Sequence, residues 1–362
     1  MIGKTTLPGA EQNIFLAQME CFTSCVLTYL NMKGYDPRLL LLDYWNFNYE
    51  KKTILSSKNA HDLPLGYLYG VEISFVKGAA SKLEELIKKG DWAIDLCSAS
   101  KLDYFPRRFL EMESSGFWHA ILITGMDEES GKYVVSDPVV DVVTRLTSDE
   151  LTAASVAKIK RDELLMFALS QVREGFQPPD ITTVLRYCSK RNAQHYRGIS
   201  RDVLPAGPGS AASGDVDKWE IWRERFRKKS TSGLAAWEQF EHDLTDSVQW
   251  PDGRRSAWIK LNTMMMTSIA QLRRKIWGIY KEFAGKGEDW EREGQEQIDG
   301  ILKLWNVMQL LMQKYDIRSK RGDGSAIGAV TAHICRIKDA ELGFLDWLQA
   351  SLGEGEHQIA IG

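Results

Sequence analysis

The chain lacks the features that mark membrane proteins and nucleic-acid-binding proteins. It contains no run approaching the roughly 18 apolar residues of a membrane-spanning helix. Residues 1–8 have no apolar core of the kind found in a signal peptide. A formal net charge of -3 gives no reason to expect nucleic acid or an anionic membrane surface as a partner. We therefore expect a cytoplasmic protein that binds neither.

Cysteine and histidine are also scarce, and neither is arranged as a metal site. The cysteines are odd in number and include no CxxC pair, which argues against a disulfide framework and against a zinc site. We expect reduced thiols. The histidines show no convincing ligand spacing, and no glycine-rich phosphate loop is present, so we expect neither a metal nor an organic cofactor. The five cysteines are Cys21, Cys25, Cys97, Cys188 and Cys335.

The first half of the chain predicts an α+β domain. Val26, Leu27 and Leu30 share one stripe of a helix that ends near Gly34. Residues 125–131 are polar and glycine-containing and separate two β-branched runs, which predicts a β-hairpin. A helix followed by strands in antiparallel order favours α+β over doubly wound α/β. The expected strands are 71–76, 92–97, 118–124 and 133–136.

The second half predicts an all-α domain. Residues 204–214 have the glycine, proline and serine content of a linker. Beyond them, apolar residues recur every three or four positions, as in a helical bundle. The expected helices are 219–229, 234–244, 254–283, 288–315 and 326–351. We therefore expect a domain at 1–175, a connecting segment and linker at 176–214, and an all-α domain at 215–353.

Cys21 stands where a loop becomes the first turn of the first predicted helix. The unpaired amides and the positive dipole end of that turn favour an anion, so this position favours a thiolate. A thiolate is the nucleophile of acyl transfer and of peptide hydrolysis, and the same amides could hold an oxyanion. Cys25 lies one turn further on. It is better explained as a small buried residue than as a second nucleophile.

A histidine and an aspartate complete a possible Cys-His-Asp triad. His119 stands near the start of one strand of the predicted hairpin, and Asp137 ends the other strand, before Pro138. Across the hairpin the two can come side by side on one face. We predict that His119 takes the proton of Cys21 and that Asp137 fixes the imidazole tautomer. A lone histidine in a strand would be better explained by packing, but the conjunction with Cys21 and Asp137 favours catalysis.

Three segments resemble the papain-like superfamily. They are residues 20–27 (ECFTSCVL), 119–125 (HAILITG) and 134–138 (VVSDP). The pattern is similar to that shared by the butirosin-biosynthesis (BtrH-like) acyltransferase family and by bacteriocin-leader cysteine peptidases, and it covers about residues 12–170. The resemblance implies a papain-like cysteine-protease fold for the first domain, with the predicted triad as its catalytic residues. The helical half is similar to the helical region of the acyltransferase family.

Two positions depart from the pattern of these families. Phe15 stands six residues before Cys21, where papain-like peptidases usually carry the oxyanion-hole glutamine. We assign that role to Gln18, with Gln12 as another substitute. Phe22 stands where leader peptidases carry glycine. Both departures weaken the peptidase interpretation more than the acyltransferase interpretation.

The leading hypothesis is therefore a cysteine acyltransferase. It would move an acyl or peptidyl group from the thioester of a carrier protein to a small-molecule amine, through an acyl-enzyme on Cys21. The resemblance implies natural-product biosynthesis, such as that of nonribosomal peptides, as the setting. The appended helical domain could exclude water from the acyl-enzyme and bind an acceptor.

Two alternatives stay open. One is a cysteine peptidase or amidase of the bacteriocin-leader-peptidase type that uses the same three residues. The other is a binding protein that has kept the fold and lost the activity, and the intact triad counts against it. Thiol reactivity separates the binding protein from the two enzymes, and dependence on an acceptor separates the transferase from the peptidase.

Overall fold

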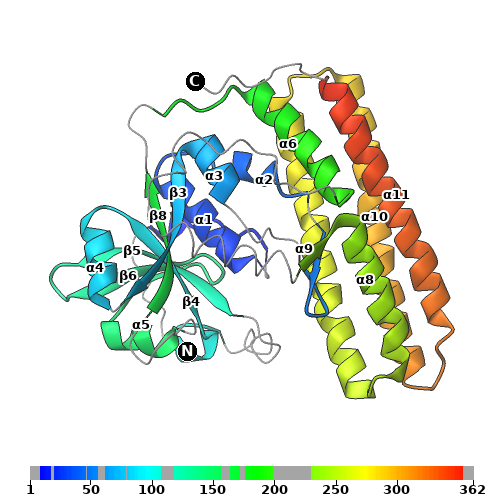
Figure 1. Ribbon diagram of the computed structural model, residues 1–362, viewed down its shortest axis with the longest axis horizontal. Coiled ribbons are helices and arrows are strands. Elements are labelled where there is room, and N and C mark those ends of the chain that lie inside the picture. Colours follow the sequence, from blue (N-terminus) through cyan, green and yellow to red (C-terminus); the bar gives the residue numbers. More distant parts are fainter. Residues whose placement is uncertain are drawn as a thin grey trace. The chain divides into compact units, whose positions relative to one another are not determined.

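In a computed structural model, the chain forms two compact units, one built on an antiparallel sheet and one built of long helices (Figure 1). The first unit comprises residues 1–37 and 61–178, and the second comprises residues 38–60 and 179–362. The α+β class expected from the sequence is confirmed. The structure describes residues 9–17, 20–45, 47–55, 62–78, 80–106, 118–155, 164–171, 176–198 and 230–353.

The sheet of the first unit has six strands in the order β3-β8-β4-β5-β6-β7, and every neighbouring pair is antiparallel. The predicted hairpin is confirmed as β5 and β6, with Leu122 opposite Ser136. The strand formed by residues 164–171, β8, lies between β3 and β4, which are the first two strands of this sheet in chain order. The strands are β3 (Val71–Gly78), β4 (Trp92–Cys97), β5 (His119–Asp127), β6 (Lys132–Asp137), β7 (Val142–Leu146) and β8 (Leu164–Gln171).

Helix α1 (Cys21–Met32) packs against β5, and this contact positions its first residue. Val26 and Leu30 are buried, as their helical spacing predicts. Gly34 follows the helix with a φ of 81°, a conformation that favours glycine. The preceding segment is fixed to the same helix, because the amide of Leu16 donates to Ser24 Oγ at 3.1 Å. The end of the helix that carries Cys21 is thereby held from two sides.

The remaining helices of the first unit are short and cover the sheet. A core cluster of this unit contains Leu83 from α4, Leu151 from α5 and alternate residues of β5 such as Ile121 and Ile123. Alternation places one residue in two on this face, as expected for a sheet with a covered side. The elements are η1 (Ala10–Gln12), α3 (Asp62–Tyr69), α4 (Ala80–Lys88), η2 (Ala99–Lys101) and α5 (Ser148–Ala154).

The second unit is a helical bundle with a small three-stranded sheet at its side. Inside it, Arg273 and Glu341 form a doubly hydrogen-bonded ion pair, with both N–O distances at 2.9 Å and no exposed surface on either side chain. Trp305 Nε1 also donates to Glu341 at 2.8 Å, so the buried charge is well compensated. The elements are α2 (Arg38–Leu41), β1 (Asn48–Glu50), β2 (Thr53–Leu55), α6 (Ile181–Tyr196), β9 (Ser230–Ser232), α8 (Gly233–Asp246), η4 (Ser247–Gln249), α9 (Asp252–Phe283), α10 (Glu288–Ser319) and α11 (Ala326–Leu352).

The two units differ from the expected domain limits at residues 38–60, which belong to the helical unit. The reason is aromatic packing. Phe47 stacks on Trp237 with ring centroids 3.8 Å apart, and Trp45 stacks on Phe344 at 4.8 Å. Helix α6, in a stretch that was expected to connect the domains, is also part of the helical unit. The expected linker at 204–214 and the expected helix at 219–229 lie outside the described residues.

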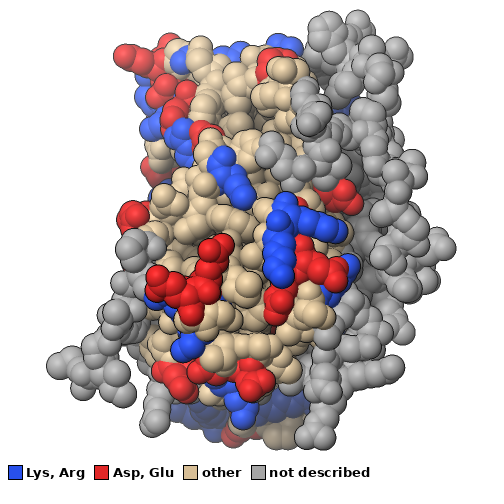
Figure 2. Space-filling view, turned by 90° about the vertical axis from the view of Figure 1, so that its left-hand side faces the viewer, with Lys and Arg blue, Asp and Glu red and all other residues tan. Residues whose placement is uncertain are grey.

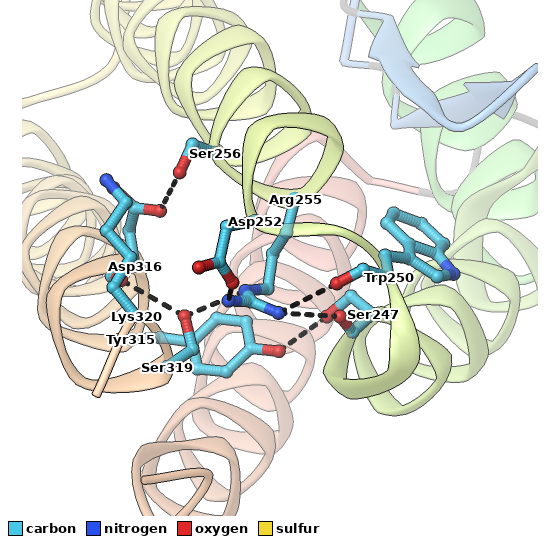
Figure 3. Close-up of polar contacts among 9 residues, drawn as sticks. All are labelled: Ser247, Trp250, Asp252, Arg255, Ser256, Tyr315, Asp316, Ser319 and Lys320. Atoms are coloured by element: carbon cyan, nitrogen blue, oxygen red, sulfur yellow. Dashed lines mark hydrogen bonds and ion pairs between the residues drawn. The ribbon is translucent and has the colours of Figure 1, made fainter. Parts of the chain in front are cut away.

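One end of the bundle is fixed by a polar network around Arg255 (Figure 3). The guanidinium donates to Ser319 Oγ at 2.8 Å and to the carbonyl of Trp250 at 3.0 Å, so it joins α10 to the turn that precedes α9. Tyr315 adds a second link through a 2.7 Å hydrogen bond to Ser247. Each polar group of this buried cluster thus has a partner, as buried polar groups require.

Among the described helices, none has the length and apolar character needed to cross a bilayer.

The β1–β2 hairpin offers a test of this fold. Its two turn residues, Lys51 and Lys52, have φ values of 48° and 68°. Two-residue turns with positive φ at both positions favour asparagine and glycine. Lys52 is held by Asp243 and by the ring of Trp250, whereas the Lys51 side chain is 80% exposed. We expect Lys51→Asn to raise the free energy of unfolding by about 0.5 kcal/mol, because asparagine tolerates this conformation better.

The measurement is chemical denaturation of the wild type and the variant at equal ionic strength. Lys51→Gln is the matched control, because it removes the same charge without relieving the backbone, and it should leave the midpoint unchanged. An equal gain from both variants would mean that charge, and not the turn conformation, limits stability at this position.

Candidate functional site

The three residues of the predicted triad lie together in the first unit, each at the end of a different element. Cys21 is the first residue of α1, His119 is the first residue of β5 and Asp137 is the last residue of β6. Because β5 and β6 are antiparallel neighbours, the start of one lies beside the end of the other. His119 Nε2 is 2.7 Å from Asp137 Oδ2, and Asp137 has no exposed surface.

The Cys21 thiol lies close enough to the imidazole to raise the pKa of His119. Because Nε2 of His119 faces Asp137, the other ring nitrogen, Nδ1, is the one available to the thiol. Cys21 Sγ is also 3.8 Å from the carbonyl oxygen of Trp118. The result is a connected row of thiol, imidazole and carboxylate, which is the arrangement needed to activate a nucleophile.

The environment of His119 favours its protonated form. Burial alone would lower its pKa, but the negative charge of Asp137 and the hydrogen bond to Asp137 raise it, and Cys21 adds to this effect through a hydrogen bond and its charge. The pKa of His119 is therefore raised to about 10. At neutral pH the ring carries a proton, and the resulting imidazolium can balance a thiolate on Cys21.

Two further groups hold the Asp137 carboxylate. The hydroxyl of Tyr104 donates to Oδ2 at 3.2 Å, and the amide of Val139 donates to Oδ1 at 3.1 Å. Phe105, next to Tyr104, lies with its ring centroid 4.6 Å from that of His119. Sequence reasoning missed Tyr104 and Phe105. In the sequence, the two residues stand out only as an aromatic pair in the loop after a predicted strand. That pattern does not indicate which strand end the loop covers.

Cys25 has the packing role that the sequence suggested. Its side chain is buried, and Sγ donates to the carbonyl of Ala120 at 3.5 Å. Burial raises the pKa of the Cys25 thiol well above its usual value, with a smaller contribution from Cys21. It therefore stays a neutral thiol while Cys21, at the end of the same helix, faces His119. No disulfide bond joins the cysteines, all five of which are among the described residues.

The proposed oxyanion-hole residue cannot be placed, because Gln18 lies outside the described residues. Phe15, at the position usual for that glutamine, is half exposed. The first turn of α1, which Cys21 begins, also carries backbone N–H groups. The amides in the first turn of an α-helix have no partner within the helix, and Glu20, which precedes Cys21, makes no side-chain cap. Its carboxylate accepts a hydrogen bond from Thr23 Oγ1 at 3.1 Å instead.

Among the described residues, one group has the composition of a metal site, and it lies in the helical unit. It consists of His242, Asp243 and Asp246. Asp243 already accepts a 2.8 Å hydrogen bond from Tyr49 and pairs with the ammonium of Lys52. Two carboxylate oxygens engaged in this way are poorly placed to bind an ion, and the other two side chains are exposed. The cluster is explained by its protein partners.

Comparison with known proteins adds no relative to this description. No protein-family model matches the chain, and no curated protein matches it.

The charge of Asp137 provides a direct test of the geometry. Asp137→Asn removes the negative charge that raises the pKa of His119, so we expect that pKa to fall from about 10 by at least about one unit. NMR titration of protein with labelled histidine measures it, and the resonance that disappears in His119→Gln identifies the residue. A wild-type His119 that titrates near the usual value of 6.5, unchanged in Asp137→Asn, would contradict the contact.

The same shift makes stability depend on pH. A raised pKa means that the folded state holds the proton more tightly, so the stabilisation is fully present below pH 6.5 and is lost as the pH rises through about 10. The difference in thermal midpoint between the wild type and Asp137→Asn should therefore shrink between pH 7 and pH 10.5. A difference that stays constant over this range would show that the aspartate stabilises the fold through packing alone.

Proposed function

We propose that this protein is a cysteine-dependent acyltransferase whose first unit is a papain-like catalytic domain. One observation carries the proposal: His119 is hydrogen-bonded to the buried carboxylate of Asp137 and lies close enough to the Cys21 thiol for the two to interact, and the three residues come from separate elements. A fold that used these residues only for packing would have no need to bury a carboxylate against a histidine beside a cysteine. In this proposal Cys21 is the nucleophile, His119 the acid and base, and Asp137 the group that orients the imidazole.

In the first step, the Cys21 thiolate attacks the carbonyl carbon of an acyl thioester on a carrier protein. The carbon–sulfur bond to the carrier breaks, and the carrier thiol leaves with the proton that His119 held. The acyl group is then bound to Cys21 as a new thioester, and His119 is neutral. The amides at the start of α1 lie next to the carbon under attack and could stabilise the oxyanion of the tetrahedral intermediate.

In the second step, an amine attacks the acyl-enzyme. Neutral His119 accepts a proton from the amine nitrogen as the new carbon–nitrogen bond forms, and the Cys21 sulfur leaves as a thiolate. The products are an amide and the starting ion pair of thiolate and imidazolium. Protons and electrons balance over the two steps, and no cofactor is needed.

The choice of an amine over water as the acceptor comes from the resemblance to the butirosin-biosynthesis family. Water could discharge the same acyl-enzyme, and the protein would then act as a peptidase or amidase. The resemblance also supplies the setting of the proposal, which is natural-product biosynthesis in the cytoplasm with a carrier protein as donor. Among the side chains coloured in Figure 2, positive and negative groups are interspersed over much of the face shown.

The first experiment is intact mass spectrometry after the protein is mixed with an acyl thioester of N-acetylcysteamine. We expect one acyl adduct on the wild type and none on Cys21→Ala. Cys335→Ala is the matched control, because Cys335 is the exposed thiol of the chain and would be the first to react without specificity. His119→Gln should slow formation of the adduct by about 10²- to 10⁴-fold.

The second arm adds a panel of amines to the isolated acyl-enzyme. Discharge by an amine, with formation of the corresponding amide, supports the transferase. Discharge by water at the same rate with or without amines favours the hydrolase. If no adduct forms and Cys21 reacts with iodoacetamide no faster than a free cysteine, the catalytic proposal fails.

A further inference from the structure

The loop after η2 lies against the His119–Asp137 pair, and no step of the reaction described above uses it. Tyr104 donates its hydroxyl to Asp137 Oδ2 at 3.2 Å, the same oxygen that His119 Nε2 approaches at 2.7 Å. The other carboxylate oxygen, Oδ1, accepts from the amide of Val139 at 3.1 Å. Two donors therefore share one oxygen, while a backbone amide holds the other oxygen in place.

This contact is largely shielded from water. Asp137 has no exposed surface, and Phe105, which is 8% exposed, packs its ring against the imidazole. A hydrogen bond to a carboxylate is stronger in such a site than in water, because no solvent competes for the acceptor. A change in the hydrogen bond from one of the two donors should therefore alter the strength of the hydrogen bond from the other.

Building on the proposed function, we propose that Tyr104 is a positioning residue for the base: its hydroxyl takes up part of the negative charge on Asp137, and this eases the release of the His119 proton. The second step of the proposed reaction explains why easier release of the His119 proton would matter. His119 must be neutral to accept a proton from the attacking amine, and the full charge of Asp137 directed at the ring would retain that proton.

The groups around His119 are consistent with this role. His119 and Tyr104 are surrounded by Cys21 and Cys25 from α1, by Cys97 from β4 (opposite His119 in the register) and by Asp137 from β6. Burial and the charge of Asp137 raise the pKa of Tyr104 well above its usual value, so the hydroxyl remains a donor at the pH of the reaction. Cys25 is likewise neutral. Once Cys21 is acylated, Asp137 is the charge among the described residues that acts on the ring.

The test compares Tyr104→Phe with Tyr133→Phe, both in the Cys21→Ala background, which lacks the thiolate as the acyl-enzyme does. Tyr133 is the matched control, because its hydroxyl donates to the carbonyl of Ala80 at 3.2 Å, away from the triad. NMR titration of His119 should give a pKa about half a unit to one unit higher in Tyr104→Phe, and no change in Tyr133→Phe. A pKa that is unchanged or lower in Tyr104→Phe overturns the proposal.

The catalytic readout is discharge of a preformed acyl-enzyme by an amine, with Cys21 present. The rising limb of the pH profile should move to higher pH in Tyr104→Phe, so that discharge at neutral pH is about three- to tenfold slower. Alkylation of Cys21 by iodoacetamide should stay within about twofold of the wild type, because the nucleophile is untouched. Equal losses in both reactions would indicate a distorted site and would overturn the assigned role.

A second variant covers the case in which Tyr104→Phe does not fold. Replacement of Tyr104 by 3-fluorotyrosine keeps the ring and strengthens the donor, so the pKa of His119 should fall, which is the opposite direction. A rise would overturn the proposal. If the wild type forms no acyl adduct, the proposed function fails, but the titration of His119 needs no substrate and still decides the role of Tyr104.

Discussion

The carboxylate of Asp137 is the constraint on which the rest of the site depends. A charge with no exposed surface is tolerated only when protein groups replace the lost water, and three donors do so here: the imidazole of His119, the hydroxyl of Tyr104 and the amide of Val139. Each donor comes from a separate position in the chain. Satisfying one buried anion therefore fixes the end of the β5–β6 hairpin, the loop after η2 and the orientation of the imidazole at the same time.

The placement of the triad could be predicted because each member lies at an element boundary that has a local signature. The helix that carries an apolar stripe begins at Cys21, a β-branched run follows His119, and Pro138 closes the strand after Asp137. A hairpin is a local structure, so the separation of His119 and Asp137 follows from the turn between them. Tyr104 could not be found in this way. Its loop reaches Asp137 only because β4 lies beside β5, and that pairing joins residues with no shared local pattern.

The same distinction explains which parts of the fold sequence reasoning placed and which it missed. The strand segments and the long helices follow their hydrophobic periods. The insertion of β8 between β3 and β4, and the membership of residues 38–60 in the helical unit, depend on which apolar surfaces meet. Phe47 and Trp45 would be equally apolar against either unit. Their stacking on Trp237 and Phe344 places them in the helical unit, and the hydrophobic pattern of the sequence does not contain that information.

The proposed reaction makes opposite demands on His119, and acylation of Cys21 can reconcile them. The resting site needs the proton on the imidazole to balance a thiolate, whereas the acyl-enzyme needs a neutral ring to accept a proton from the amine. In the resting site, Cys21 adds to the raised pKa of His119 through a hydrogen bond and through its charge. In the proposed first step, conversion of Cys21 to a neutral thioester would remove both contributions, so that step itself would make the His119 proton easier to release. Among the described residues, the charge of Asp137 then still raises the pKa of the ring. The hydroxyl of Tyr104, as a second donor to the same oxygen, reduces that effect, so the buried carboxylate can orient the imidazole and still allow it to lose its proton.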